Sequence, residues 1–129
     1  MRVQTPVLDI ELERAGPPDG PIVLLLHGWP DDVHTWDRVA PALHEMGFHT
    51  ITPYLRCYGP TRFRSEDIMR SGQLSALGQD VLDLADALDL RRFAVIGHDW
   101  GARAAYIAAA VASNSASVNQ PGGPQVSQM

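Results

Sequence analysis

Two short motifs, far apart in the sequence, contain the residues best suited to chemistry. The first is Gly97-His98-Asp99-Trp100-Gly101, which places an aspartate between two glycines. The second is His27-Gly28-Trp29-Pro30. A carboxylate is ionised at pH 7 without a neighbouring base, so Asp99 can attack an electrophilic carbon directly. Backbone amides of the second motif can stabilise negative charge that develops in such a reaction.

The spacing of glycines around Asp99 matches a nucleophile elbow, which is a sharp turn between a strand and a helix. Gly97, His98 and Gly101 complete this elbow, and it lifts the central side chain above the sheet edge. The alternative is that Asp99 only caps the following helix, a contribution of about 1 kcal/mol. The second motif favours the elbow, because it also follows a buried strand and is expected to face Asp99.

Alternating apolar segments position these motifs. Three short apolar runs predict buried strands at residues 22–26, 48–52 and 93–96. Helices are predicted at 36–46, from Gln73 onwards, and at 102–112, and a strand or hairpin at 2–13. In the second helix the apolar positions are Leu77, Val81, Leu84 and Leu88, with Asp80, Asp83 and Asp86 on other faces. This order predicts an α/β fold with a mostly parallel sheet and helices on both faces.

Two segments do not fit the alternation. Residues 54–72 predict a long loop of the kind that covers a site. Residues 113–129 are polar and rich in Ser, Asn, Gln, Gly and Pro, which predicts a disordered tail. The predicted organisation is therefore one partial core over 1–112 and a tail over 113–129.

Composition narrows the function classes. The chain is 45% hydrophobic and 19% charged, as in ordinary globular proteins, and its net charge of -5 disfavours nucleic acid as a partner. The longest apolar stretch, Ala104 to Ala112, is too short to cross a membrane, so we expect no membrane association and a cytoplasmic location. Cys57 is the single cysteine, which excludes an internal disulfide and two-cysteine zinc motifs. We expect no metal and no cofactor.

Together with Arg56-Cys57-Tyr58-Gly59, the two motifs resemble those of the epoxide hydrolase and haloalkane dehalogenase branch of the α/β-hydrolases. The resemblance covers residues 1 to about 112. It implies a hydrolase in which Asp99 attacks a carbon of a small apolar organic substrate, forming an ester that water cleaves. It also implies that the backbone amides of Trp29 and Trp100 form the oxyanion hole, in a loop shaped by His27, Gly28 and Pro30.

The resemblance favours hydrolysis of an epoxide to a diol, with haloalkane dehalogenation as the alternative. A serine esterase is disfavoured because the elbow contains no serine. Cys57 stands where the family commonly has glycine, and a Cβ at a position of positive φ would cost about 1 kcal/mol.

Family members continue with another strand, a helical cap, an acidic residue and a catalytic histidine, none of which follows Ala112. We therefore expect the N-terminal half of the α/β-hydrolase fold, without the C-terminal half and cap, and no turnover by this chain alone. A non-catalytic fragment is the alternative. The strand at 93–96 is then expected to have an unpaired edge, which invites self-association.

Overall fold

The computed structural model describes residues 1–116 and 125–128. Its strands are β1 (Arg2–Gln4), β2 (Leu8–Ala15), β3 (Ile22–Leu26), β4 (His49–Pro53), β5 (Arg62–Phe63), β6 (Arg92–Gly97) and β7 (Gln125–Gln128). Its helices are the short 3-10 helix η1 (Val33–Trp36) and the α-helices α1 (Ala40–Glu45), α2 (Leu74–Ala87) and α3 (Trp100–Ala116). Strands and helices alternate after the first hairpin, so the predicted α/β class is confirmed.

The strands form one mixed sheet in the order β1-β2-β4-β3-β6-β7, with β5 paired to β2. Its middle is parallel, because β3 runs parallel to both β4 and β6. The hairpin β1-β2 adds antiparallel strands on one side, where β2 pairs with β4. The sheet is thus parallel at its centre and antiparallel at this edge, where the predicted N-terminal hairpin lies.

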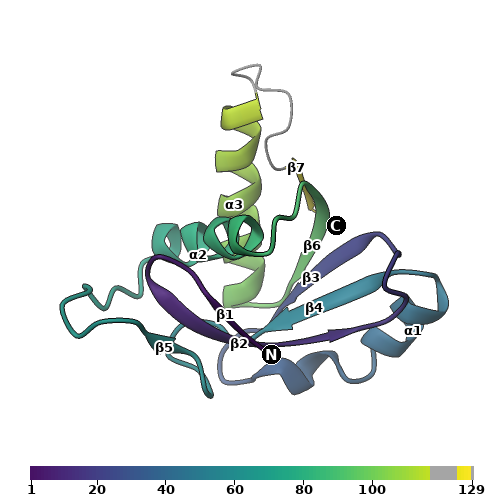
Figure 1. Cartoon of the computed structure of the whole chain (residues 1–129), viewed down its shortest axis with the longest axis horizontal. Coiled ribbons are helices and arrows are strands. Elements are labelled where there is room, and N and C mark those ends of the chain that lie inside the picture. The colour runs from purple at the N-terminus through teal and green to yellow at the C-terminus, as the bar shows by residue number, and fades with distance from the viewer. Residues whose placement is uncertain (117–124, 129) are drawn as a thin grey trace.

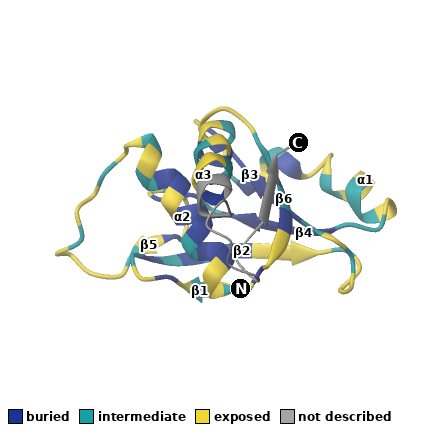
Figure 2. Ribbon diagram, turned by 90° about the horizontal axis from the view of Figure 1, so that it is seen from above, coloured by how far each residue is buried: buried dark blue, intermediate teal, exposed yellow. Residues whose placement is uncertain are grey.

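Alternate residues of β3 face two different layers of helices. Leu24 and Leu26 belong to the larger core, which also contains buried residues of α2 and α3. Val23 and Leu25 pack with Trp36 on the opposite face, beside α1. Helices on both faces of the sheet are therefore confirmed (Figure 1), and Figure 2 shows burial concentrated in the central strands. In the described part of the chain, no helix has the length and apolar character needed to cross a bilayer.

The predicted helix at 36–46 is wrong in its extent. The structure has η1 up to Trp36 and a separate α1 from Ala40, with Pro41 in the first turn. Proline has no backbone N–H and its ring clashes with the preceding turn, so it is tolerated at a helix start but not inside one. The helix therefore begins at Ala40, with Pro41 as its second residue, instead of running through the proline from Trp36.

The predicted disordered tail over 113–129 also differs from the structure. Helix α3 continues to Ala116, since each Ser or Asn costs a propagating helix only a few tenths of a kcal/mol. Residues 125–128 form β7, which runs parallel to β6 from the pair Arg92–Gln125 to the pair Val95–Gln128. Backbone pairing at a sheet edge does not require apolar side chains. The edge of β6 is therefore occupied by β7, so the predicted unpaired edge of this strand is wrong, while self-association stays a prediction. Residues 117–124 and 129 lie outside the described residues.

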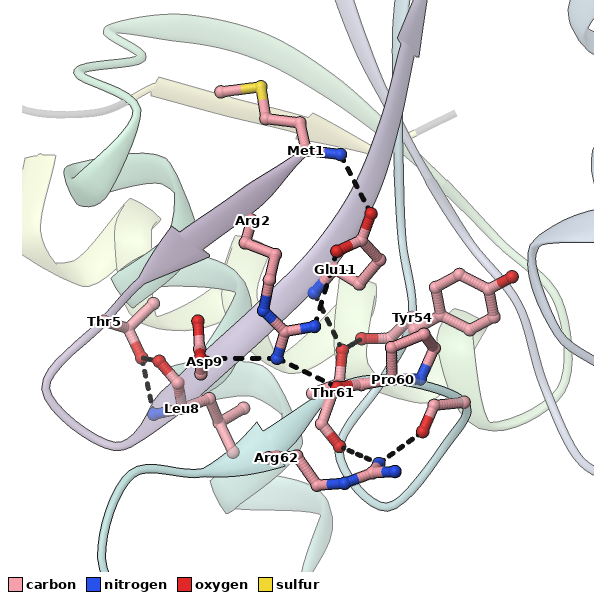
Figure 3. A network of polar contacts seen from close by, with 11 residues as sticks. Met1, Arg2, Thr5, Leu8, Asp9, Glu11, Tyr54, Pro60, Thr61 and Arg62 are labelled. Carbon is pink, nitrogen blue, oxygen red and sulfur yellow. Dashed lines mark hydrogen bonds and ion pairs between the residues drawn. The ribbon is translucent and has the colours of Figure 1, made fainter.

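The long segment between β4 and α2 is tied to the first hairpin. The hydroxyl of Thr61 accepts from the backbone N–H of Glu11 at 3.1 Å and donates to the carbonyl of Tyr54 at 2.9 Å. Arg2 donates to the carbonyl of Pro60 at 3.0 Å (Figure 3). The segment predicted as a loop thus contains the short strand β5 and is held along its middle.

A substitution of Gly78 tests how closely α2 packs against α3. A Cβ at this position would lie 2.4 Å from Cγ2 and 2.8 Å from Cβ of Ile107. We expect Gly78→Ala to lower the free energy of unfolding by about 1–3 kcal/mol, because overpacking outweighs the roughly 1 kcal/mol by which alanine favours a helix. Urea unfolding measures this change. Gly72→Ala is the control, since a Cβ there meets nothing within 4 Å, and a more stable Gly78→Ala protein would contradict the expectation.

Candidate active site

Asp99 lies at the turn between β6 and α3, at the end of a parallel central strand. Its backbone has a φ of 55°, in the left-handed region that side chains other than glycine rarely adopt. The turn is tight: a Cβ at Gly101 would lie 2.2 Å from the carbonyl oxygen of Leu26, and one at Gly97 would lie 2.4 Å from the carbonyl carbon of Gly101. The geometry of a nucleophile elbow is present, with the Asp99 side chain exposed at the strand end.

The loop after β3 lies directly against this turn. A Cβ at Gly28 would be 2.5 Å from Cβ of Asp99 and 2.5 Å from the carbonyl oxygen of His98. The absence of a side chain at Gly28 lets the backbone of Trp29 approach, and its N–H donates to Oδ2 of Asp99 at 3.1 Å. Pro30 follows through a cis peptide bond. The two predicted motifs are therefore brought together.

Backbone amides keep the Asp99 carboxylate ionised. The N–H of Trp100 and then that of Trp29 lower the pKa of Asp99 below its usual range, since a hydrogen bond to the charged form favours that form. Both amides predicted as oxyanion-hole donors thus lie at this carboxylate. No base is needed to activate it near neutral pH.

His27 is fully buried and is held by both ring nitrogens. The N–H of Leu55 donates to its Nε2 at 3.0 Å, which puts the ring proton on Nδ1, 3.3 Å from the carbonyl oxygen of Gly28. Burial lowers the pKa of His27 from its ordinary value, so the ring is neutral at pH 7. Its ring also makes an edge contact with Tyr58 at 4.8 Å between centroids. These contacts make His27 a support for the loop.

The other histidines do not contact the carboxylate through their rings. The His98 side chain is exposed, and only its backbone is hydrogen-bonded. His34 pairs with Asp37 at 3.1 Å and His44 with Thr50 at 2.7 Å. His49 is buried in β4, where Arg14 donates to it at 3.3 Å. Within the described part of the chain, no histidine side chain is hydrogen-bonded to Asp99.

A pocket of about 250 Å³ lies beside the elbow. Trp100 and Leu77 line it, together with residues 56–58 and 70–72 from the two ends of the long loop. Trp29 is 66% exposed and is not among the lining residues. The two ends of the loop predicted over 54–72 therefore lie at the pocket, whereas its middle, residues 59–69, is not among the lining residues. The described residues contain no group of three or more His, Cys, Asp or Glu arranged to hold a metal ion.

Sequence reasoning missed a buried ion pair in the wall of this pocket. Arg56 donates to both carboxylate oxygens of Asp80 at 2.7 Å, and both side chains are almost fully buried. Burial raises the pKa of Asp80, and Arg56 opposes this shift; the hydrogen bonds to Asp80 raise the pKa of Arg56. We placed Asp80 off the apolar face of this helix, and that placement is wrong. It lies three residues after Leu77 and four before Leu84, a spacing that contained the signal of its burial. A buried carboxylate needs a partner.

Comparison with known proteins supports the resemblance that the sequence motifs indicate. A family profile described as the alpha/beta hydrolase fold matches residues 21–119. Epoxide hydrolase A of Mycobacterium tuberculosis is 35% identical over 104 residues, and an epoxide hydrolase of Caballeronia sordidicola is 38% identical over 90 residues. A crystal structure of a Klebsiella pneumoniae protein proposed to be an epoxide hydrolase superposes with a TM-score of 0.83 at 47% identity.

The matches cover most of this chain but a smaller part of each relative. The chain coverage is 78% and 70% for the two sequence relatives and 86% for the crystal structure. The corresponding shares of those proteins are 30%, 27% and 37%. The chain thus spans about a third of the length of the relatives it matches.

A substitution of Cys57 tests the backbone strain in the loop between β4 and α2. The φ of Cys57 is 68°, in the left-handed region that favours glycine, and its side chain is exposed. We expect Cys57→Gly to raise the free energy of unfolding by about 1 kcal/mol, because glycine adopts positive φ without a clash. Urea unfolding measures it. Cys57→Ala keeps the Cβ and is the matched control; an equal gain in that variant would assign the effect to the thiol.

A substitution of His27 tests how this residue changes the free energy of unfolding with pH. Because its pKa is lowered on folding, the unfolded chain binds a proton more tightly, and stability falls as pH drops below the ordinary value near 6.5. We expect the free energy of unfolding to decrease between about pH 7.5 and about pH 5.5, with a smaller decrease in His27→Gln. Urea titrations at both pH values measure it.

His34 provides the control, because Asp37 raises its pKa and reverses the sign. His34→Gln is expected to make the loss of stability on acidification steeper. A stability that stays constant or rises on acidification in this variant would contradict the role given to His27.

Proposed function

Because the chain belongs to the family of the alpha/beta hydrolase fold, we propose that Asp99 is the nucleophile of an epoxide hydrolase-like reaction. The observation that carries the proposal is the strained position of Asp99, with a φ of 55° and the Trp29 N–H 3.1 Å from its Oδ2. The relatives reported above are named epoxide hydrolases, which favours an epoxide over a haloalkane.

The first step forms an ester on Asp99. Oδ2 accepts from the backbone N–H of Trp29, so Oδ1 attacks a ring carbon of the epoxide with its electron pair. The new C–O bond forms as the ring C–O bond breaks, and the ring oxygen leaves as an alkoxide that takes a proton from water or an acid. The pocket of about 250 Å³ beside Trp100 suits a small, largely apolar organic epoxide.

The second step cleaves this ester, and the same amides act again. After alkylation, Oδ2 becomes the carbonyl oxygen of the ester, and water attacks the adjacent carbon with loss of a proton to a base. Negative charge then develops on Oδ2, where the N–H groups of Trp29 and Trp100 serve as the oxyanion hole. Collapse of this intermediate breaks the bond between Cγ and Oδ1, and the diol leaves with Oδ1 after its alkoxide takes a proton back from the base. The restored carboxylate then contains Oδ2 and the oxygen from water.

The two steps differ in what they require from the chain. Ester formation needs the ionised carboxylate, whereas ester cleavage needs a base at the attacking water. Since no histidine side chain in the described ranges is hydrogen-bonded to Asp99, we propose that this chain forms the ester faster than it cleaves it. The close packing between the loop after β3 and the turn after β6 is permitted by Gly28, Gly97 and Gly101. The residues to which we assign a structural role in these two segments are His27, Pro30 and His98. The cytoplasmic location stays a prediction.

Esterification of Asp99 by an epoxide tests the proposed function. The 129-residue chain is incubated with styrene oxide near neutral pH and digested, and the peptides are analysed by mass spectrometry. We expect an ester on Asp99 that accumulates to nearly one per chain, and at least about a hundredfold slower labelling in Asp99→Asn. Asp89 is an internal control, because it is also an exposed aspartate with positive φ, 53°, but lies outside the site.

Labelling of other carboxylates at the rate of Asp99, or none at Asp99, would refute the proposed function. A parallel reaction with 1-bromobutane tests the alternative. Ester formation on Asp99 with release of one bromide per chain, in the absence of any reaction with the epoxide, would favour haloalkane dehalogenase-like chemistry.

A further inference from the structure

The wall of the pocket beside Trp100 is built from the two ends of one loop. Residues 56–58 come from the start of this loop and residues 70–72 from its end, directly before α2. Between them the chain makes a long exposed excursion through β5 (Figure 2). The pocket therefore exists only while these two ends are held near each other and near the elbow.

One guanidinium joins both ends of the loop to α2. Arg56 donates through Nε and Nη2 to Asp80 of α2, each at 2.7 Å, and through Nη1 to the carbonyl of Ser71 at 2.6 Å. All three nitrogens are thus engaged, by one partner on the helix and one at the far end of the loop. A planar guanidinium can make these contacts at once, whereas a lysine ammonium cannot reproduce the fork.

The start of the loop is also connected to the oxyanion side of the site. Leu55 precedes Arg56 and donates its N–H to His27, and the Tyr58 ring packs on the His27 ring. His27 is followed by Gly28 and then by Trp29, whose N–H holds Asp99. The position of Arg56 is therefore coupled, through one buried ring, to the amide at the nucleophile.

The structure assigns to Arg56 and Asp80 the role of a positioning pair that holds the pocket wall and the loop around His27 in place for the reaction at Asp99. Neither side chain contacts the reacting carboxylate. The inference rests on the proposed function for its effect on reaction rate, but its effect on the loop does not depend on that function.

A buried ion pair need not exist for stability. Replacing such a pair by apolar side chains of similar volume often leaves stability unchanged or raises it, while removal of one partner leaves an uncompensated buried charge. This difference separates positioning from stabilisation. An apolar double replacement removes the tie between Arg56 and Ser71 without leaving a charge behind.

The experiment compares Arg56→Lys, Asp80→Asn and the double variant Arg56→Met/Asp80→Leu with the unmodified chain. Two quantities are measured: hydrogen exchange of peptides from residues 54–72, and the second-order rate constant of Asp99 esterification by styrene oxide. We expect exchange in this loop to accelerate about tenfold or more and the rate constant to fall about tenfold in all three variants. The double variant is expected to do so while its urea midpoint stays at or above that of the unmodified chain.

Two controls match the substitutions in charge and location. Arg62→Lys alters an arginine in the same loop that donates to the carbonyls of Gly59 and Thr61 and does not reach α2. Asp83→Asn removes a carboxylate from α2 that accepts from Gln79 on the helix surface. Both are expected to keep the loop exchange and the rate constant of the unmodified chain.

Each outcome of this experiment either supports or overturns the positioning role of Arg56 and Asp80. Recovery of both exchange protection and rate in the apolar double variant, or unchanged loop exchange in the single variants, would overturn the positioning role. Failure of the unmodified chain to form an ester at Asp99 refutes the proposed function and the effect on rate with it. The exchange data then decide separately whether the pair holds the loop.

Discussion

The close contact between the loop after β3 and the turn after β6 is the constraint on which the site depends. It requires the two strands to be neighbours in parallel register, and Leu26 is indeed paired with Gly97 at their ends. It also requires glycine on both sides, because a Cβ at Gly28 or Gly101 would overlap backbone or Asp99 atoms at 2.2–2.5 Å. This contact determines where the Trp29 amide meets the Asp99 carboxylate.

The same contact explains why the carboxylate is exposed and yet restrained. Asp99 projects from a backbone conformation that costs energy for any residue with a Cβ, and only the surrounding packing maintains it. The amides of Trp29 and Trp100 lower its pKa through hydrogen bonds to the charged form, not through burial. An exposed carboxylate held by backbone donors loses little solvation and remains accessible from solvent.

The sequence predicted the features that follow from short-range rules. The strand at 22–26 matches β3 in both bounds, because a run of branched apolar residues between Pro21 and the His27 motif has few other structures available. The elbow follows from glycine spacing. The extent of α1 was predicted wrongly because the apolar period was given more weight than Pro41. The pairing of the mostly polar residues 125–128 with β6 depends on backbone hydrogen bonds that leave no side-chain pattern.

The ion pair between Arg56 and Asp80 could be predicted only in part from the sequence. Each half had a local signal, an arginine in a motif and an acidic residue on an apolar helix face, but their distance in sequence hid the pairing. Neighbouring Cys57 adopts positive φ with a Cβ, so this stretch contains both a strained residue and a desolvated charge. A loop selected for stability alone would have neither feature. Their concentration at the pocket wall fits a segment whose shape is constrained by what it must place beside Trp100.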